Sequence, residues 1–145
     1  MNRVIKFRGK CVEDSKYAGE WVVGGCSMPD EDVDSKKYGN EWLITVYLGG
    51  NCSCSYHVIP ETVGQFTGFC DEKGNEIYEG DILLLEGAKT NIIKRVDFDT
   101  EKGTWKAVAV NTVQSHDLYE WLKTSEVIGN IHDNPELLKG ELNND

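Results

Sequence analysis

Apolar and polar residues alternate over many short stretches of this chain, and turns rich in glycine separate the stretches. Alternation with a period of two is typical of half-buried β-strands. Before residue 60 the pattern predicts strands at 4–12, 20–25, 42–48 and 54–59. After residue 60 it predicts strands at 65–70, 82–86, 91–98, 104–110 and 127–131. Because most neighbouring strands are joined by tight turns, we expect antiparallel hairpins.

One segment has a helical pattern. Ser115 can cap a helix that continues to Lys123, and Leu118 and Leu122 lie one turn apart. We therefore expect a mainly β fold, of the α+β kind with one short helix. The order of hairpins, helix and last strand in the C-terminal part is compatible with a small SH3-like barrel.

The composition of the connections suggests two β subdomains. Pro60–Gly64 reads as a link between a predicted N-terminal β subdomain, 1–60, and a C-terminal β subdomain, 61–138. Residues 139–145 form a polar tail.

Several residues are predicted to serve turn geometry rather than a ligand. Gly74 can supply the positive φ of a hairpin loop, and aspartates commonly bond to the backbone of their own turn. The predicted structural turn residues are Gly68, Asp71, Gly74, Gly80, Asp81, Gly129 and Pro135.

Charge limits the classes of partner. The formal net charge is −10 and the pI about 4.7, with the acidic excess in the C-terminal part. An acidic surface repels phosphate backbones, so nucleic acid is not the expected partner. The N-terminus is locally basic, through Arg3, Lys6, Arg8 and Lys10. We expect these charges to pair with acidic residues of this chain or of a second copy.

The chain has no apolar run of the roughly 20 residues that a membrane helix needs, and its start lacks the apolar region of a signal peptide. We therefore expect no membrane association and a cytoplasmic location. In that compartment the five cysteines are expected to be reduced.

Two stretches have a spacing that could bind metal. Asp30, Asp32, Asp34 and Glu41 follow the carboxylate spacing of a calcium loop, but Ser35 stands where glycine is needed. Cys52, Cys54 and His57 could bind zinc, with Cys70 as a fourth ligand. A solvated acidic loop and small buried cysteines explain the same residues, so we predict no metal and no other cofactor.

Further groups of residues could form catalytic or stacking sites. Glu76, Glu79 and Asp81 could form a carboxylate site, but acidic turns are usually solvated, and we predict no catalytic residues. Six aromatic residues could stack on bases, although core packing or a subunit interface explains them without a basic groove. These are Trp21, Trp42, Tyr78, Trp105, Tyr119 and Trp121.

Two blocks of the chain resemble the YopX-like family of small bacteriophage and prophage proteins. One block is Thr67–Ile82, with Asp71, Gly74 and Glu76-Ile-Tyr-Glu-Gly-Asp-Ile, and the other is Val127–Leu138. The resemblance implies a phage or prophage origin, a mostly β fold and homo-oligomerisation. It implies no catalytic residues and no defined biochemical activity.

Together these observations lead to one main hypothesis and two alternatives. The main hypothesis is a non-enzymatic phage accessory protein that acts through protein–protein contacts as a homo-oligomer, with a host or phage protein as partner. The first alternative is a nucleic-acid-associated module that uses the basic N-terminal strand and surface aromatics. The second is an acidic mimic of nucleic acid. An enzyme would require a polar pocket with converging acids and a histidine.

Overall fold

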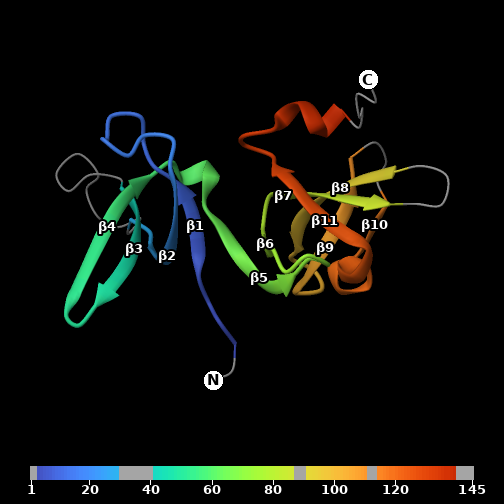
Figure 1. The fold of residues 1–145 in the computed structure, drawn as a ribbon, viewed down its shortest axis with the longest axis horizontal. Coiled ribbons are helices and arrows are strands. Elements are labelled where there is room, and N and C mark those ends of the chain that lie inside the picture. The colour runs from blue at the N-terminus through green and yellow to red at the C-terminus, as the bar shows by residue number, and fades with distance from the viewer. Residues whose placement is uncertain (1–2, 30–40, 87–90, 111–113, 140–145) are drawn as a thin grey trace. The chain divides into compact units, whose positions relative to one another are not determined.

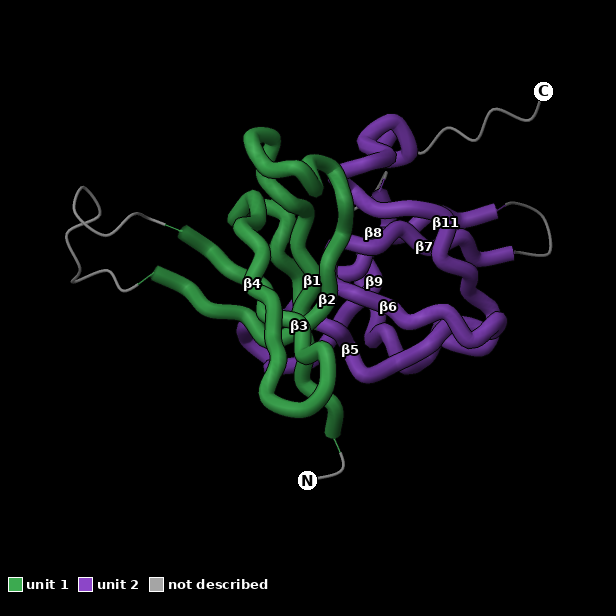
Figure 2. Tube along the Cα trace, turned by 60° about the vertical axis from the view of Figure 1, so that its left-hand side comes forward, with its two compact units in different colours: residues 1–65 green, residues 66–145 purple. Residues whose placement is uncertain are grey.

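The computed structural model describes residues 3–29, 41–86, 91–110 and 114–139. The chain divides into two compact units, residues 1–65 and 66–145 (Figure 2), where the sequence suggested a boundary at residue 60. In the described ranges, no helix is long and apolar enough to cross a membrane.

The first unit is an antiparallel sheet of strands that follow one another in the chain (Figure 1). Its strands are β1 (Phe7–Lys10), β2 (Trp21–Ser27), β3 (Trp42–Gly49) and β4 (Cys52–Val58). A 3-10 turn, η1 (Pro60–Thr62), leads into β5 (Gly64–Cys70), whose first residues pair with β1.

The end of β4 returns to the residues that follow β1. Cys11 and Val58 form an isolated antiparallel bridge, and the Val12 N–H donates to the His57 carbonyl at 3.1 Å. Cys11, Val58 and Ile44 are almost fully buried and form the small core of this unit. Burial, with a smaller contribution from the charge of Glu20, raises the pKa of the Cys11 thiol, which makes it a poor nucleophile.

The second unit contains a five-stranded antiparallel sheet in the order β10-β9-β8-β7-β11. Within this unit the end of β5 pairs with β6. Its other elements are β6 (Glu76–Tyr78), β7 (Asp81–Glu86), β8 (Asn91–Asp99), β9 (Thr104–Ala109), β10 (Ser115–Asp117), η2 (Leu118–Thr124), β11 (Ser125–Asn130) and η3 (Pro135–Lys139). The core consists of Ile77, Leu83, Leu85, Val96, Ala107 and Leu118.

The predicted mainly β, antiparallel class is confirmed. Over the described residues the five-stranded sheet is open between β10 and β11, so the SH3-like arrangement does not extend to a closed barrel there. The predicted start of the helix at Ser115 is wrong. Ser115–Asp117 form strand β10 against β9, and the helix is a 3-10 helix that begins at Leu118. Ladder bonds to β9 outweigh the capping preference of a serine.

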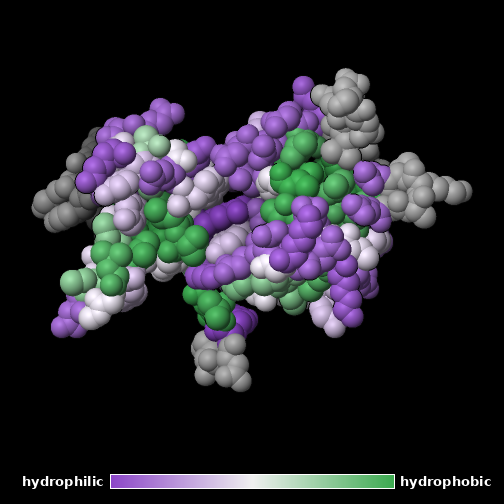
Figure 3. Space-filling model, in the orientation of Figure 1, coloured by the Kyte–Doolittle hydropathy of each residue, from purple (hydrophilic) through white to green (hydrophobic). Residues whose placement is uncertain are grey.

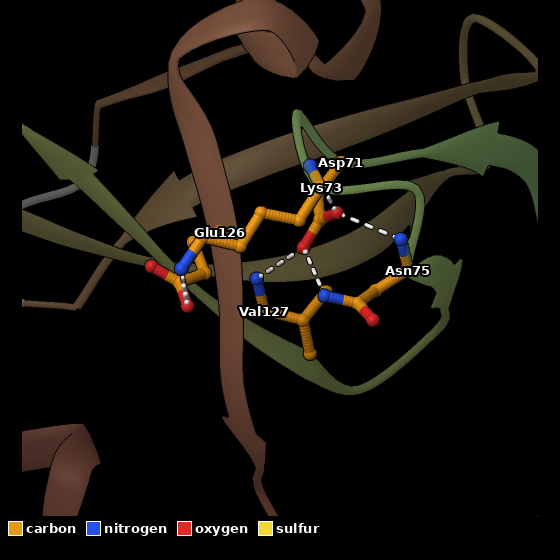
Figure 4. A network of polar contacts seen from close by, with 5 residues as sticks. All are labelled: Asp71, Lys73, Asn75, Glu126 and Val127. Carbon is orange, nitrogen blue, oxygen red and sulfur yellow. Dashed lines mark hydrogen bonds and ion pairs between the residues drawn. The ribbon is translucent and has the colours of Figure 1, made fainter.

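Asp71 connects the two blocks that resemble the family (Figure 4). Its carboxylate accepts hydrogen bonds from the backbone N–H groups of Lys73 (3.0 Å) and Asn75 (2.8 Å), and from the Asn75 side-chain amide (3.1 Å). A fourth bond comes from the Val127 N–H at 2.9 Å, on β11. β11 is an edge strand whose other side pairs with β7. Asp71 thus accepts a hydrogen bond from a backbone N–H group that the exposed edge of β11 could otherwise donate to another strand.

The other turn residues lie in tight backbone geometry. Gly68, Gly74 and Gly80 have φ angles of 88°, 85° and 88°. Asp81 is 1% exposed and accepts the Tyr78 N–H at 2.7 Å. A Cβ at Gly129 would overlap the side-chain carbonyl of Asn134. Pro135 opens η3 directly after that asparagine.

Candidate functional site

A pocket of about 400 Å³ lies in the first unit. It forms where the bridge between Cys11 and Val58 brings the turn after β1 to the paired ends of β3 and β4. Its lining combines apolar and acidic side chains with one histidine and one serine: Val12, Asp14, Ser15, Glu41, Trp42, His57, Val58 and Pro60.

The turn side of the pocket is fixed by its own hydrogen bonds. The Ser15 hydroxyl donates to the Val12 carbonyl at 3.0 Å and accepts the Tyr17 N–H at 3.3 Å. Such a bonded serine stabilises a turn. On the strand side, Trp42 lies directly opposite Val58 across the β3–β4 ladder, and this pair supplies an apolar wall.

His57 and Glu41 form a polar contact in the pocket. His57 Nδ1 lies 3.4 Å from Glu41 Oε2, and the two side chains are 48% and 57% exposed. A polar contact this open to solvent contributes little to stability. Both groups therefore remain accessible to a ligand.

The pocket brings together a serine, a histidine and a carboxylate, the residue types of a nucleophilic triad. In a triad the serine hydroxyl bonds to the imidazole. Here the Ser15 hydroxyl donates instead to the Val12 carbonyl, and no hydrogen bond between Ser15 and His57 exists in this described part of the chain. The pocket can also bind a ligand. Its apolar wall and its carboxylates, Asp14 and Glu41, suit a group with an apolar body and a positive charge.

The structure separates the residues considered for metal binding. Cys54 and His57 are an odd number of positions apart on β4, so they lie on opposite faces of the strand. No group of three or more His, Cys, Asp or Glu side chains suited to a metal occurs among the described residues. Cys70 belongs to the second unit. Of the candidate calcium loop, Asp30, Asp32 and Asp34 lie outside the described residues, and Glu41 pairs with His57.

The acidic residues of the second unit contact the bend between β6 and β7. Glu76 accepts a hydrogen bond from the Tyr78 hydroxyl at 2.9 Å, while Asp81 accepts the Tyr78 N–H. Glu79 also takes part in a polar interaction. Bonds of this kind orient a turn.

The aromatic residues considered for stacking divide between the units. Trp21 and Trp42 belong to the first, and the Trp21 ring already faces the Arg8 guanidinium at 4.9 Å. Tyr78, Trp105, Tyr119 and Trp121 belong to the second, where Trp105 and Trp121 pack against the core.

The sequence interpretation missed a buried lysine. Lys94 is 3% exposed on β8, and its ammonium lies 4.2 Å from the centre of the Trp121 ring. Burial lowers the pKa of Lys94, while the charge of Glu120 acts in the opposite direction. The sequence did contain a signal for this burial. Position 94 lies between Ile92 and Val96 in the period-two pattern, so it shares the face of β8 that places Val96 in the core.

Two solved structures share this fold. Protein EF1440 from Enterococcus faecalis is 21% identical, with a TM-score of 0.53 over 94% of this chain and 99% of its own. Protein yopX from Bacillus subtilis is 15% identical, with a TM-score of 0.54 over 97% of this chain and 99% of its own. No curated protein matches. At these identities the two structures support the fold alone.

The model of the family described as YopX protein matches residues 6–139, which include both blocks joined by Asp71 and every residue that lines the pocket. The chain therefore belongs to the YopX protein family.

Proposed function

We propose that this chain is a non-enzymatic phage or prophage accessory protein of the bacterial cytoplasm, and that it acts through protein–protein contacts as a homo-oligomer. The observation that carries the proposal is the exposure of large apolar side chains at the end of β3. Tyr47 is 82% exposed and Leu48 is 67% exposed, next to the turn at Gly49 and Gly50.

Further apolar side chains of this unit support a contact surface. Val23 and Met28, in and just after β2, are 40% and 69% exposed. Figure 3 shows hydrophobic residues gathered over strands of this unit on the visible face. Exposed apolar side chains favour an interface, and an aromatic residue such as Tyr47 is typical of its centre.

The test is a comparison of molar mass by light scattering, at several concentrations, between the wild-type protein and the double variant Tyr47→Ser, Leu48→Ser. Burying a large apolar side chain is worth about 1.5–3 kcal/mol, so the double change should weaken self-association by at least about a hundredfold. Tyr119→Ser, which changes a 74% exposed tyrosine in the second unit, should leave the mass unchanged. A wild-type protein that is monomeric at every concentration would contradict the homo-oligomer.

The nucleic-acid alternative rests on the Arg8–Trp21 pair of the basic first strand. An arginine on an aromatic ring occurs in sites that bind single strands, but this ring face is already occupied. The alternative predicts that the protein binds single-stranded DNA at low salt, with an affinity that falls as salt rises. A mass unchanged by DNA at low salt would rule it out.

A further inference from the structure

A charged side chain faces the core of the second unit. Lys94 shares a face of β8 with Val96, a core residue. Its direct neighbours across the ladder are Leu83 on β7 and Ala109 on β9. A lysine between Leu83 and Ala109 packs its methylene chain well, but its ammonium loses most of its water.

The ammonium of Lys94 has no hydrogen-bond acceptor and no ion-pair partner among the described residues. Its nearest defined contact is the face of the Trp121 ring, at 4.2 Å. Glu120 acts on it only through its charge, without an ion pair within bonding distance. The ring offsets part of the lost hydration, but it accepts no conventional hydrogen bond.

A second donor without a partner lies in the same cluster. The Trp121 Nε1–H is fully enclosed and lacks an acceptor. The ring of His116, on β10, stands edge-on to Trp121 with 5.3 Å between the ring centres. Buried donors are normally satisfied, so the enclosed indole N–H of Trp121, next to an ammonium without a protein acceptor, points to an acceptor that the protein chain does not supply.

We propose that Lys94, Trp121 and His116 form a binding site for a small oxyanion, either a phosphate or a carboxylate group. An oxyanion provides several acceptor lone pairs, so it can accept from the Lys94 ammonium and from the Trp121 indole together. A neutral ligand would leave the ammonium uncompensated. His116 lies at the edge of this cluster and adds a donor to the anion.

The test is a titration of the labelled protein with inorganic phosphate and, separately, with acetate, at constant ionic strength. The resonance of the Trp121 indole N–H, assigned with Trp121→Phe, reports binding. A saturable shift with either anion is expected, and the tighter of the two identifies the phosphate or the carboxylate class. Lys94→Met should weaken the binding at least about tenfold, the loss typical of a charge-assisted hydrogen bond.

The control is Lys106→Met, which removes the same charge from β9. Lys106 pairs with Asp97, which lies three residues after Lys94 on β8. An odd spacing along a strand places Asp97, and with it Lys106, on the opposite face of the sheet from Lys94. This variant should bind like the wild-type protein. Trp121→Phe keeps an aromatic ring but removes the indole donor, and in a calorimetric titration it should bind several-fold more weakly. Absence of a saturable shift with both anions, or equal losses in Lys94→Met and Lys106→Met, would overturn the proposal.

Discussion

Replacing Gly24 with alanine is expected to lower the free energy of unfolding of the first unit by about 3 kcal/mol. A Cβ atom at this position would overlap the carbonyl oxygen of Thr45 and lie 2.8 Å from its carbonyl carbon. Both atoms belong to the backbone of β3, next to the pairing of Gly25 with Thr45. A flexible side chain could turn aside, but a paired strand can only shift as a whole.

Urea unfolding, followed by tryptophan fluorescence, measures this effect. Gly25→Ala is the matched control, since it makes the same chemical change one residue further along β2. An added Cβ at Gly25 meets nothing within 4 Å. That variant should stay within about 0.5 kcal/mol of the wild-type protein. Equal stabilities of the two variants would contradict the close approach of β2 and β3.

The strands could be predicted because their signals are local. Alternation and turn glycines define β3 and the hairpin around Gly74 almost to the residue. The pocket could not be predicted, because it depends on Cys11 meeting Val58, and a bridge between residues so far apart leaves no periodic trace. The sequence pattern therefore did not indicate that Ser15 and Glu41 lie near His57.

Strand geometry explains two differences between the sequence patterns and the structure. The zinc hypothesis counted the distance between Cys54 and His57 along the chain, but an odd spacing on a strand points side chains to opposite faces. The predicted helix exists but begins at Leu118, because residues 115–117 instead extend the β8–β9 hairpin. Lys94 was missed, although its position two residues before Val96 already placed it on the core face.

The hydrogen bonds of Asp71 make it the polar residue whose loss should cost the second unit most. Asp71→Asn is expected to lower the free energy of unfolding by about 3 kcal/mol at neutral pH. Oδ2 accepts from the Val127 N–H and the Asn75 side chain, and Oδ1 accepts from the backbone of Lys73 and Asn75. An asparagine has one acceptor oxygen, so either orientation points an NH₂ group at two donors.

Glu72→Gln is the matched control for this change. It neutralises an exposed carboxylate in the same turn, which accepts no hydrogen bond within the described part of the chain. Its stability should stay within about 0.5 kcal/mol of the wild-type protein. If Asp71→Asn lowers the free energy of unfolding as little as Glu72→Gln does, the Asp71 carboxylate does not hold the turn to β11.

The pH dependence gives a second, independent measurement. Burial by itself raises the pKa of Asp71, but the bonds from Val127, Asn75 and Lys73 outweigh it and hold the pKa below its usual value. A carboxyl whose pKa is lowered by folding adds stability above its unfolded pKa, about 3.9 for an aspartate. That contribution is lost as the pH falls through the lowered pKa of the folded state.

The difference in stability between the wild-type protein and Asp71→Asn should therefore be constant near neutral pH and should shrink below about pH 4. Urea unfolding at a series of pH values measures this difference in stability. Hydrogen exchange at the Val127 amide shows whether the difference arises at β11. In the variant this amide loses its acceptor and should exchange faster at neutral pH. A difference that stays constant down to the most acidic pH would show that the charge of Asp71 is not what holds the edge of β11.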